Sequence, residues 1–224
     1  MNTTILDNSQ MQTLRGLIDQ YKTLHAKEPF NGQGEQYKWE LLDKTESKRL
    51  LDVIEILLKE KINLWDTGRV MPVFKYLKEQ HTEEFENCLK ALTDESIPLL
   101  DRLSAYKKTM RSLCPTKFRV YANDERTAAT ILTCVRPNTY TFYKDEVYRY
   151  LCEKLGVDTK NPGRKYEHFL ELLNAIDKEY GDEIQQIMTP ETKKYRNRPV
   201  LLAVQTVLWV MTKYKDDAEL SENT

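Results

Sequence analysis

The chain has 224 residues, of which 31% are charged, but it contains only 7 glycines and 8 prolines. This length is enough for one domain with a real core, and the shortage of glycine and proline argues against a β-sandwich or barrel and favours helices. The formal net charge of −1 says little about partners, so local charge asymmetry is the more informative quantity.

Cysteine usage and the N-terminus indicate a cytoplasmic protein. The cysteines form no CxxC pair, which argues against a zinc knuckle or disulfide framework and predicts reduced, partly buried thiols. The N-terminal residues lack the cationic and apolar regions of a signal peptide. The longest apolar run, residues 199–211, is too short to span a bilayer, so no membrane partner is expected. The cysteines are Cys88, Cys114, Cys134 and Cys152.

Apolar residues recur at helical spacing through the first half of the chain. An amphipathic helix is predicted over residues 8–24, and a Gly/Gln/Pro loop follows it. The triplet Tyr37-Lys38-Trp39 starts a short helical turn, in which Trp39 is more often a core residue than a ligand-binding one. Pro72 is tolerable only in the first turn of its helix. Further helices are predicted over residues 50–61, 70–77, 82–92 and 96–113.

Residues 121–157 are predicted to form a helix, a short aromatic strand and a second helix. Asp124 is a candidate N-cap of the first helix, and the β-branched and aromatic residues 139–143 favour a strand. Asp145 can cap the second helix, and Gly156 suits its C-terminal end.

The C-terminal third continues the helical pattern. A long helix begins near Tyr166 and is expected to break near Gly181, and residues 200–211 form a helix that is apolar all round and therefore buried. Residues 215–224 are expected to be a disordered tail or linker. The fold class is mainly α, a single domain over residues 1–214 with about nine helices and one small β element near residues 139–143.

Charge is distributed unevenly along this predicted fold. Between Arg102 and Tyr150, ten Lys/Arg and four Asp/Glu give a local charge of +6, and eight aromatic residues fall in the same window. Cations hold phosphates and rings stack on bases, so this window indicates a nucleic-acid surface. The alternative is that most of the rings are core and the cations solvate a helix surface.

Alternation along the strand orients the rings of residues 139–143. Tyr140 and Phe142 lie on one side of a strand and Tyr143 on the other. Because Phe142 is the apolar member, it is expected to point into the core, which leaves Tyr143 for outward stacking.

Most catalytic signatures are absent from the sequence. No P-loop, HExxH, GxSxG or dinucleotide fingerprint occurs, so neither a nucleotide nor another cofactor is expected. The histidines His25, His81 and His168 lack metal-ligand spacing and are expected at exposed or edge positions. Glu46-Ser47-Lys48 has the E-x-K element of metal nucleases but no β-hairpin to position it. Catalysis by this chain alone is therefore not expected.

Several short motifs follow one another along residues 36–211. The most specific is the P-x-x-Y-x-x-Y-K pattern from Pro137 to Lys144. With these motifs the chain resembles the N-terminal region of McrB-type AAA+ GTPase subunits of modification-dependent (5-methylcytosine) restriction systems. The other motifs are Glu35-Gln36-Tyr37-Lys38-Trp39, Asp94-Glu95-Ser96, Leu100-Asp101-Arg102-Leu103, Asp124-Glu125-Arg126-Thr127, Val200-Leu201-Leu202 and Leu208-Trp209.

The resemblance implies a non-catalytic DNA-recognition module. In that family a GTPase motor follows the N-terminal region and a separate nuclease subunit cuts, so DNA, an AAA+ GTPase domain and a nuclease subunit are the implied partners. This sequence lacks the motor. Two alternatives stay open: an assembly domain that docks to a motor or partner subunit through apolar helix faces, and an unrecognised enzyme.

Candidate DNA-binding residues fall into two groups. The cations of the first group would contact phosphates and its rings would stack on or cage a base. The second group is the basic segment before the last helix, whose N-terminal end could hold an anion, although a solvated loop is the default. The first group is Lys38, Trp39, Arg126, Arg136, Tyr140, Tyr143, Lys144 and Arg149, and the second is Lys193, Lys194, Arg196 and Arg198.

Overall fold

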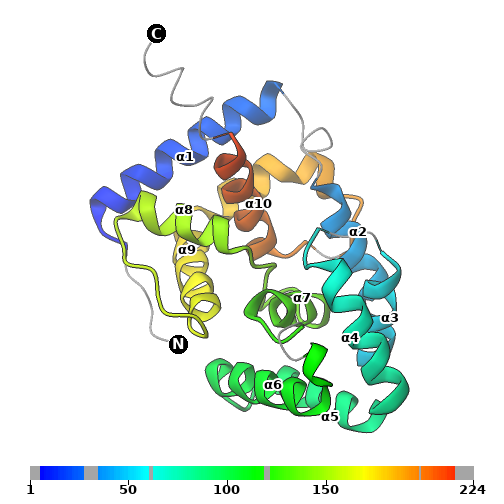
Figure 1. The fold of residues 1–224 in the computed structure, drawn as a ribbon. Coiled ribbons are helices and arrows are strands. Elements are labelled where there is room, and N and C mark those ends of the chain that lie inside the picture. The colour runs from blue at the N-terminus through cyan, green and yellow to red at the C-terminus, as the bar shows by residue number, and fades with distance from the viewer. Residues whose placement is uncertain (1–5, 28–34, 61–62, 119–121, 197, 215–224) are drawn as a thin grey trace.

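The computed structural model describes residues 6–27, 35–60, 63–118, 122–196 and 198–214. Within these ranges the chain forms ten α-helices, one short 3-10 helix and no strand, and 76% of it is helical. The mainly α fold class is therefore confirmed (Figure 1). The helices are α1 (Asn8–Lys27), α2 (Gln36–Thr45), α3 (Leu50–Lys59), α4 (Thr67–Gln80), α5 (Thr82–Thr93), α6 (Leu99–Leu113), η1 (Thr116–Phe118), α7 (Glu125–Val135), α8 (Asp145–Leu155), α9 (Lys165–Thr192) and α10 (Val200–Lys213).

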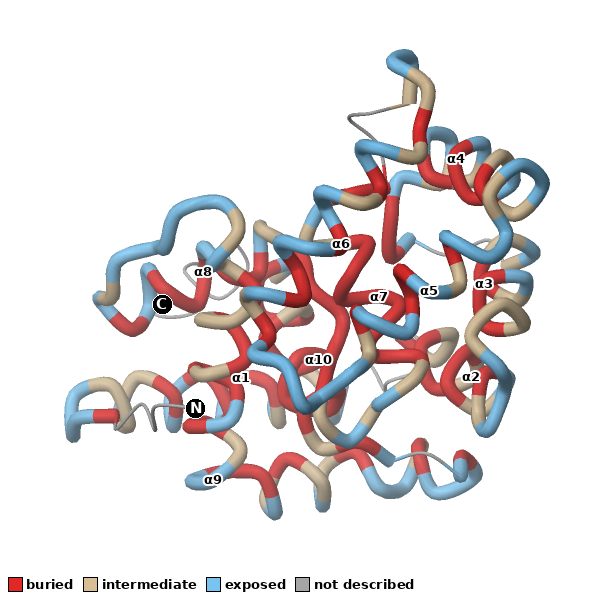
Figure 2. The backbone as a smooth tube through the Cα atoms, turned by 90° about the horizontal axis from the view of Figure 1, so that it is seen from below, coloured by how far each residue is buried: buried red, intermediate tan, exposed pale blue. Residues whose placement is uncertain are grey.

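The C-terminal helix α10 lies in the middle of the molecule. It packs against α9, α1 and α8, and its tube in Figure 2 is almost wholly buried. The expectation that Leu201, Val204, Leu208 and Met211 are inaccessible is confirmed, since all four are buried. A helix that is apolar on all sides is stable in water only when other elements cover every side, and α10 is covered in this way.

The other helices cover this centre in two groups. Helices α1, α8 and α9 surround α10 on one side, whereas α2 to α6 gather around α7 on the other, with α5 and α6 paired along their length (Figure 1). One continuous apolar cluster runs from α1 to α10 through both groups. The loops between α6 and α7 and between α8 and α9 therefore meet at the surface beside α7.

The small β element expected at residues 139–143 is not formed, and this prediction was wrong. β-propensity favours an extended backbone, but a strand also needs a neighbouring strand, and the described residues supply none. The backbone of this segment is instead held by single hydrogen bonds, such as the one from Tyr166 Oη to Thr141 O at 3.0 Å. Helices cover both sides of the segment, so Tyr140, Phe142 and Tyr143 are all buried.

Local helix signals agree with the structure in part. Asp124 does cap α7, with Thr127 N donating to its Oδ1 at 2.7 Å, and Gly156 ends α8 in the left-handed region at φ 62°. Asp145 does not cap α8 but is its first helical residue. Pro72 lies in the second turn of α4 rather than the first.

Two expectations concern the C-terminal part: a break in the long helix near Gly181 and a disordered tail after residue 214. Helix α9 runs unbroken through Gly181, contrary to the predicted break, and the expected tail at residues 215–224 lies outside the described residues. A Cβ at Gly181 would lie 2.1 Å from Asp177 Oδ1 in the same helix and 3.3 Å from Val200 Cγ1 at the start of α10, so a glycine leaves room for both side chains.

Leu208→Ala should lower the free energy of unfolding by about 2–5 kcal/mol, since it removes buried methyl groups and leaves a cavity in the centre of the molecule. The midpoint of urea unfolding measures this loss. Lys213→Ala, on an exposed position of the same helix, is the matched control and should change stability little. Equal midpoints for the two variants would contradict the central position of α10.

Candidate functional site

Most members of the first predicted group of DNA-binding residues lie inside the protein. The rings proposed for stacking are core residues, and Tyr143 is only 5% exposed, so its expected outward orientation is wrong. The alternative that the rings belong to the core is correct for them. The buried members of the first group are Lys38, Trp39, Tyr140, Tyr143 and Lys144.

Arg102, inside the same basic window, is also buried and serves the fold. Its guanidinium donates to Tyr140 Oη at 2.7 Å, to Leu92 O at 2.8 Å and to Ile97 O at 2.9 Å. This single side chain ties the loop between α5 and α6 to the segment after α7. Each of the three guanidinium nitrogens thus donates to an acceptor inside the protein, and the buried Arg102 is not available to a phosphate.

The remaining cations of the first group are closer to the surface but are partly engaged. Arg126 donates to Leu64 O at 2.7 Å and to Asn63 O at 3.0 Å, which fastens α7 to the segment before α4. Arg136 is exposed, 3.8 Å from Glu95.

Arg149 is exposed as well, on α8, and its guanidinium lies 2.7 Å from Asp145. Exposed ion pairs of this kind contribute about 0–1 kcal/mol, so Arg136 and Arg149 can both exchange their partner for another anion.

Lys38 is the most deeply buried of these cations, with 0% of its surface exposed. Its ammonium group pairs with Glu35 and donates to Gln205 Oε1 at 2.8 Å. Burial lowers the pKa of Lys38, while the Glu35 carboxylate opposes that shift. Lys38 stands three and four residues before Leu41 and Leu42, and this helical spacing could have indicated an inward side chain.

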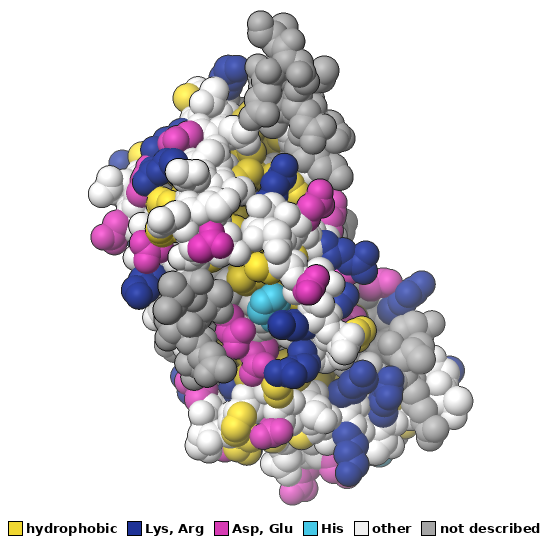
Figure 3. All heavy atoms as spheres, turned by 90° about the vertical axis from the view of Figure 1, so that its left-hand side faces the viewer, with side chains coloured by type: hydrophobic (Ala, Val, Ile, Leu, Met, Phe, Trp, Pro, Cys, Tyr) yellow, Lys and Arg dark blue, Asp and Glu magenta, His cyan; other side chains and the backbone are white. Residues whose placement is uncertain are grey.

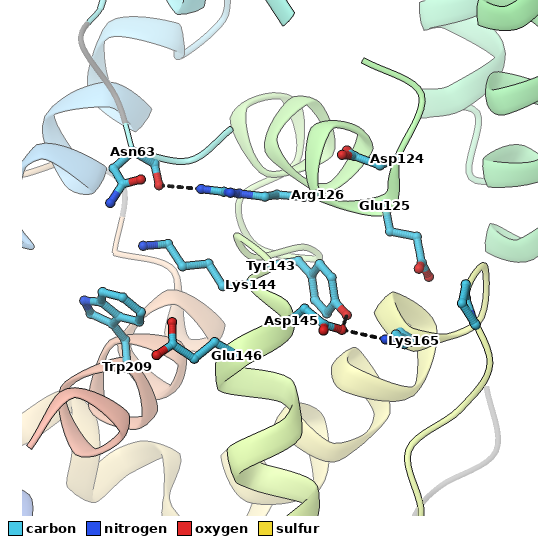
Figure 4. Close-up of a pocket in the computed structure, with 11 residues that line it drawn as sticks. Asn63, Asp124, Glu125, Arg126, Tyr143, Lys144, Asp145, Glu146, Lys165 and Trp209 are labelled. Carbon is cyan, nitrogen blue, oxygen red and sulfur yellow. Dashed lines mark hydrogen bonds and ion pairs between the residues drawn. The ribbon is translucent and has the colours of Figure 1, made fainter. Parts of the chain in front are cut away.

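A pocket of about 510 Å³ opens above the ring of Trp209 (Figure 4). Lys144 extends across it toward Asn63, and its Nζ lies 3.7 Å from the centre of the Trp209 ring. The walls come from the N-terminal end of α7, the start of α8, the start of α9 and α10. The lining residues are Asn63, Asp124, Glu125, Arg126, Tyr143, Lys144, Asp145, Glu146, Pro162, Lys165 and Trp209.

The charges around this pocket affect one another. Burial lowers the pKa of Lys144 to about 8, and the nearby cations Lys38 and Arg126 act in the same direction. Burial opposes ionisation of Asp145, but hydrogen bonds from Lys165 at 2.7 Å and Tyr143 at 3.0 Å outweigh it and lower its pKa. The pocket therefore holds a stable carboxylate and an amine that is readily deprotonated.

A second groove, of about 400 Å³, lies between α6 and the loop before α9. Lys107 and Arg111 line it from α6, and Arg164 lines it from the loop. The two carboxylates that line it, those of Asp124 and Glu125, accept hydrogen bonds from backbone N–H groups. Asp124 caps α7, and Glu125 accepts from Gly163 N at 3.1 Å and from Tyr166 N at 3.0 Å.

The three cations that line this groove, Lys107, Arg111 and Arg164, are exposed. Neither they nor Lys108, the exposed neighbour of Lys107 on α6, make a side-chain hydrogen bond or ion pair within the described ranges. Figure 3 shows Lys and Arg side chains gathered over the lower part of the face that it presents, on the side of the molecule where α6 lies. The α6 cations fall in the basic window but were not among the predicted DNA-binding residues. The i, i+4 spacing of Lys107 and Arg111, which places both on one face of a helix, could have indicated them.

The second predicted group lies apart from this groove, between α9 and α10. Its cations are exposed, and Arg198 donates to Lys193 O at 2.5 Å and to Tyr195 O at 3.3 Å. Arg196 lies 3.7 Å from Glu46. Arg198 therefore supports the loop itself, whereas Arg196 lies near the segment between α2 and α3. The group is Lys193, Lys194, Arg196 and Arg198.

Groups typical of metal or thiol chemistry are scattered. Within the described ranges, no three His, Cys, Asp or Glu side chains come together as metal ligands would. The histidines His25, His81 and His168 are half-buried in separate parts of the fold, and the four cysteines are buried free thiols. In the same part of the chain, no helix has the length and apolar character needed to cross a bilayer.

Comparisons of the chain with models of protein families, with curated proteins and with solved structures gave no match. Its function therefore has to be argued from the surfaces described above.

Lys38→Met should destabilise the protein by about 3–5 kcal/mol, because it leaves the Glu35 carboxylate buried without its cation. The matched control is the double variant Lys38→Met/Glu35→Gln, which removes both charges and should recover much of the loss. Denaturant unfolding of the two variants measures the difference. Equal destabilisation would show that packing, and not the buried charge, is responsible.

The depressed pKa of Lys144 predicts a pH dependence of stability. The pKa of Lys144 is about 8 in the folded chain and about 10.4 in the unfolded chain. Between these two pH values only the unfolded chain holds a proton at this lysine, so the free energy of unfolding rises with pH. From pH 8 to pH 9.5 the wild type should gain about 1–2 kcal/mol relative to Lys144→Met. Titrating thiols affect both proteins equally and cancel in this comparison. A constant difference would contradict the depressed pKa.

Proposed function

We propose that this chain is a non-catalytic DNA-binding module that contacts the phosphates of a duplex through the cations around the α6 groove. The observation that carries the proposal is that Lys107, Arg111 and Arg164 line one groove from two segments that are distant in sequence, and that all three are exposed and make no side-chain hydrogen bond or ion pair within the described ranges. Such cations lose little solvation on meeting phosphates, and their contact releases counterions.

The absence of exposed rings supports a duplex over a single strand. No Phe, Tyr or Trp among the described residues is exposed, whereas binding of single strands usually depends on bases stacking on such rings. Phosphate contacts alone fix position on the duplex without reading the bases. Binding through this groove should thus be largely independent of sequence.

The resemblance to McrB-type N-terminal regions supports a more specific role, as the DNA-recognition part of a modification-dependent restriction system. Its partners would then be an AAA+ GTPase domain and a nuclease subunit. In the structure the quoted motifs consist largely of residues that hold the fold, such as Arg102, Asp124 and Tyr140. The motifs therefore support likeness of fold more directly than likeness of ligand.

The runner-up is an assembly domain. Ile97 is the exposed large hydrophobic residue of the described ranges, at 39%, and it borders a hollow lined by Pro98, Leu99 and Leu170. This apolar area is small, which is why DNA binding is the preferred proposal.

Lys107→Ala/Arg111→Ala should weaken duplex binding and reduce the slope of log K against log salt by roughly one unit per lost phosphate contact. Titrations at low and moderate salt against duplex and single-stranded DNA measure both effects. Lys193→Ala/Lys194→Ala removes the same charge at the second group and is the matched control.

Equal slopes for the two double variants would place the contact surface elsewhere. Absence of binding to either DNA at low salt would favour the assembly domain instead. Comparing the affinities for methylated and unmodified duplexes of the same sequence tests the restriction role separately. Phosphate contacts in the α6 groove alone predict equal affinity for the two duplexes.

A further inference from the structure

Lys144 occupies an unusual position for a lysine. Its side chain is 9% exposed, it lines a pocket of about 510 Å³, and it makes no hydrogen bond or ion pair within the described ranges. A buried ammonium normally has a carboxylate partner, because its desolvation is otherwise uncompensated. Here the contact at Nζ is the face of Trp209.

The charged groups around Lys144 do not supply that partner. Lys38 on α2 and Arg126 on α7 are cations that disfavour its protonated form. Glu35 and Glu146 act in the opposite direction, but Glu35 is already paired with Lys38. The face of the Trp209 ring attracts a cation, but it carries no net charge to neutralise one.

We infer that Lys144 is a nucleophilic amine site that forms an imine with a small aldehyde entering the pocket over Trp209. An amine can attack a carbonyl only in its neutral form, and lysines become nucleophilic when desolvated or placed beside another cation. Lys144 meets both conditions, and its Nζ borders an open volume large enough for a small organic molecule.

The reaction balances without a further reagent. The nitrogen lone pair of Lys144 attacks the carbonyl carbon, a C–N bond forms, the π electrons of the C=O bond move to oxygen, and a proton passes from the nitrogen to that oxygen. The C–O bond then breaks as the C–N bond becomes C=N, and the oxygen leaves as water with the second proton of the nitrogen. Nothing is oxidised or reduced, and the imine remains reversible by hydrolysis. This inference is independent of DNA binding, and its test contains no nucleic acid.

The test is labelling of the folded chain with benzaldehyde and sodium cyanoborohydride, which reduces the imine to a stable amine, followed by peptide mapping. At pH 7 the neutral fraction of an amine with a pKa of about 8 exceeds that of an ordinary lysine on the order of 100-fold. A less basic amine is also a weaker nucleophile, which offsets part of this gain. Lys144 should therefore be labelled at least about tenfold faster than the exposed Lys107 and Lys108.

Three further readouts make the result specific. The ratio of labelling at Lys144 to labelling at Lys107 and Lys108 should be largest near pH 7 and fall as pH approaches 10, where the exposed lysines also become neutral, and the preference should disappear in denaturing urea. Lys144→Arg keeps the cation and should remove the fast-labelled peptide while leaving Lys107 and Lys108 unchanged. Labelling of Lys144 no faster than these two exposed lysines at pH 7, or a labelling ratio that stays the same from pH 7 to pH 10, would overturn the inference.

Discussion

The ammonium group of Lys38 lies where α2 meets the centre of the fold, and much of the structure depends on how it is satisfied. Glu35 supplies the charge and Gln205, in the middle of α10, supplies an acceptor. An uncompensated charge in this position would cost several kcal/mol, so α2 and α10 have to adopt one relative register. The same cation disfavours protonation of Lys144, which links the core to the pocket above Trp209.

The helices were predictable because their signals are local. Apolar spacing indicated α10 and its burial, and the side chain of Asp124 indicated the start of α7. The β element at residues 139–143 was not predictable in the same way, since pairing depends on a second segment that local propensity cannot reveal. Three buried rings on consecutive and alternate positions are possible there only because helices enclose the segment from several sides.

The candidate site was less predictable than the fold. A count of charges indicated a basic window, but it could not distinguish Arg102, which is used up by internal acceptors, from Lys107, which is free. That distinction depends on tertiary contacts between segments far apart in sequence. Arg164 illustrates the same limit, because its place opposite α6 follows from the way Glu125 holds the loop before α9.

Glu125 belongs to both hollows, since the first turn of α7 is the wall that separates the α6 groove from the pocket of Lys144. Its carboxylate also accepts hydrogen bonds from the backbone of Gly163 and Tyr166, which join this wall to the loop before α9 and to the start of α9. Thermodynamic linkage then applies: an occupant that displaces this wall from one side alters affinity on the other by a certain factor, and the reverse effect has the same size. The basic α6 groove and the pocket of Lys144 thus share the first turn of α7 as a common wall.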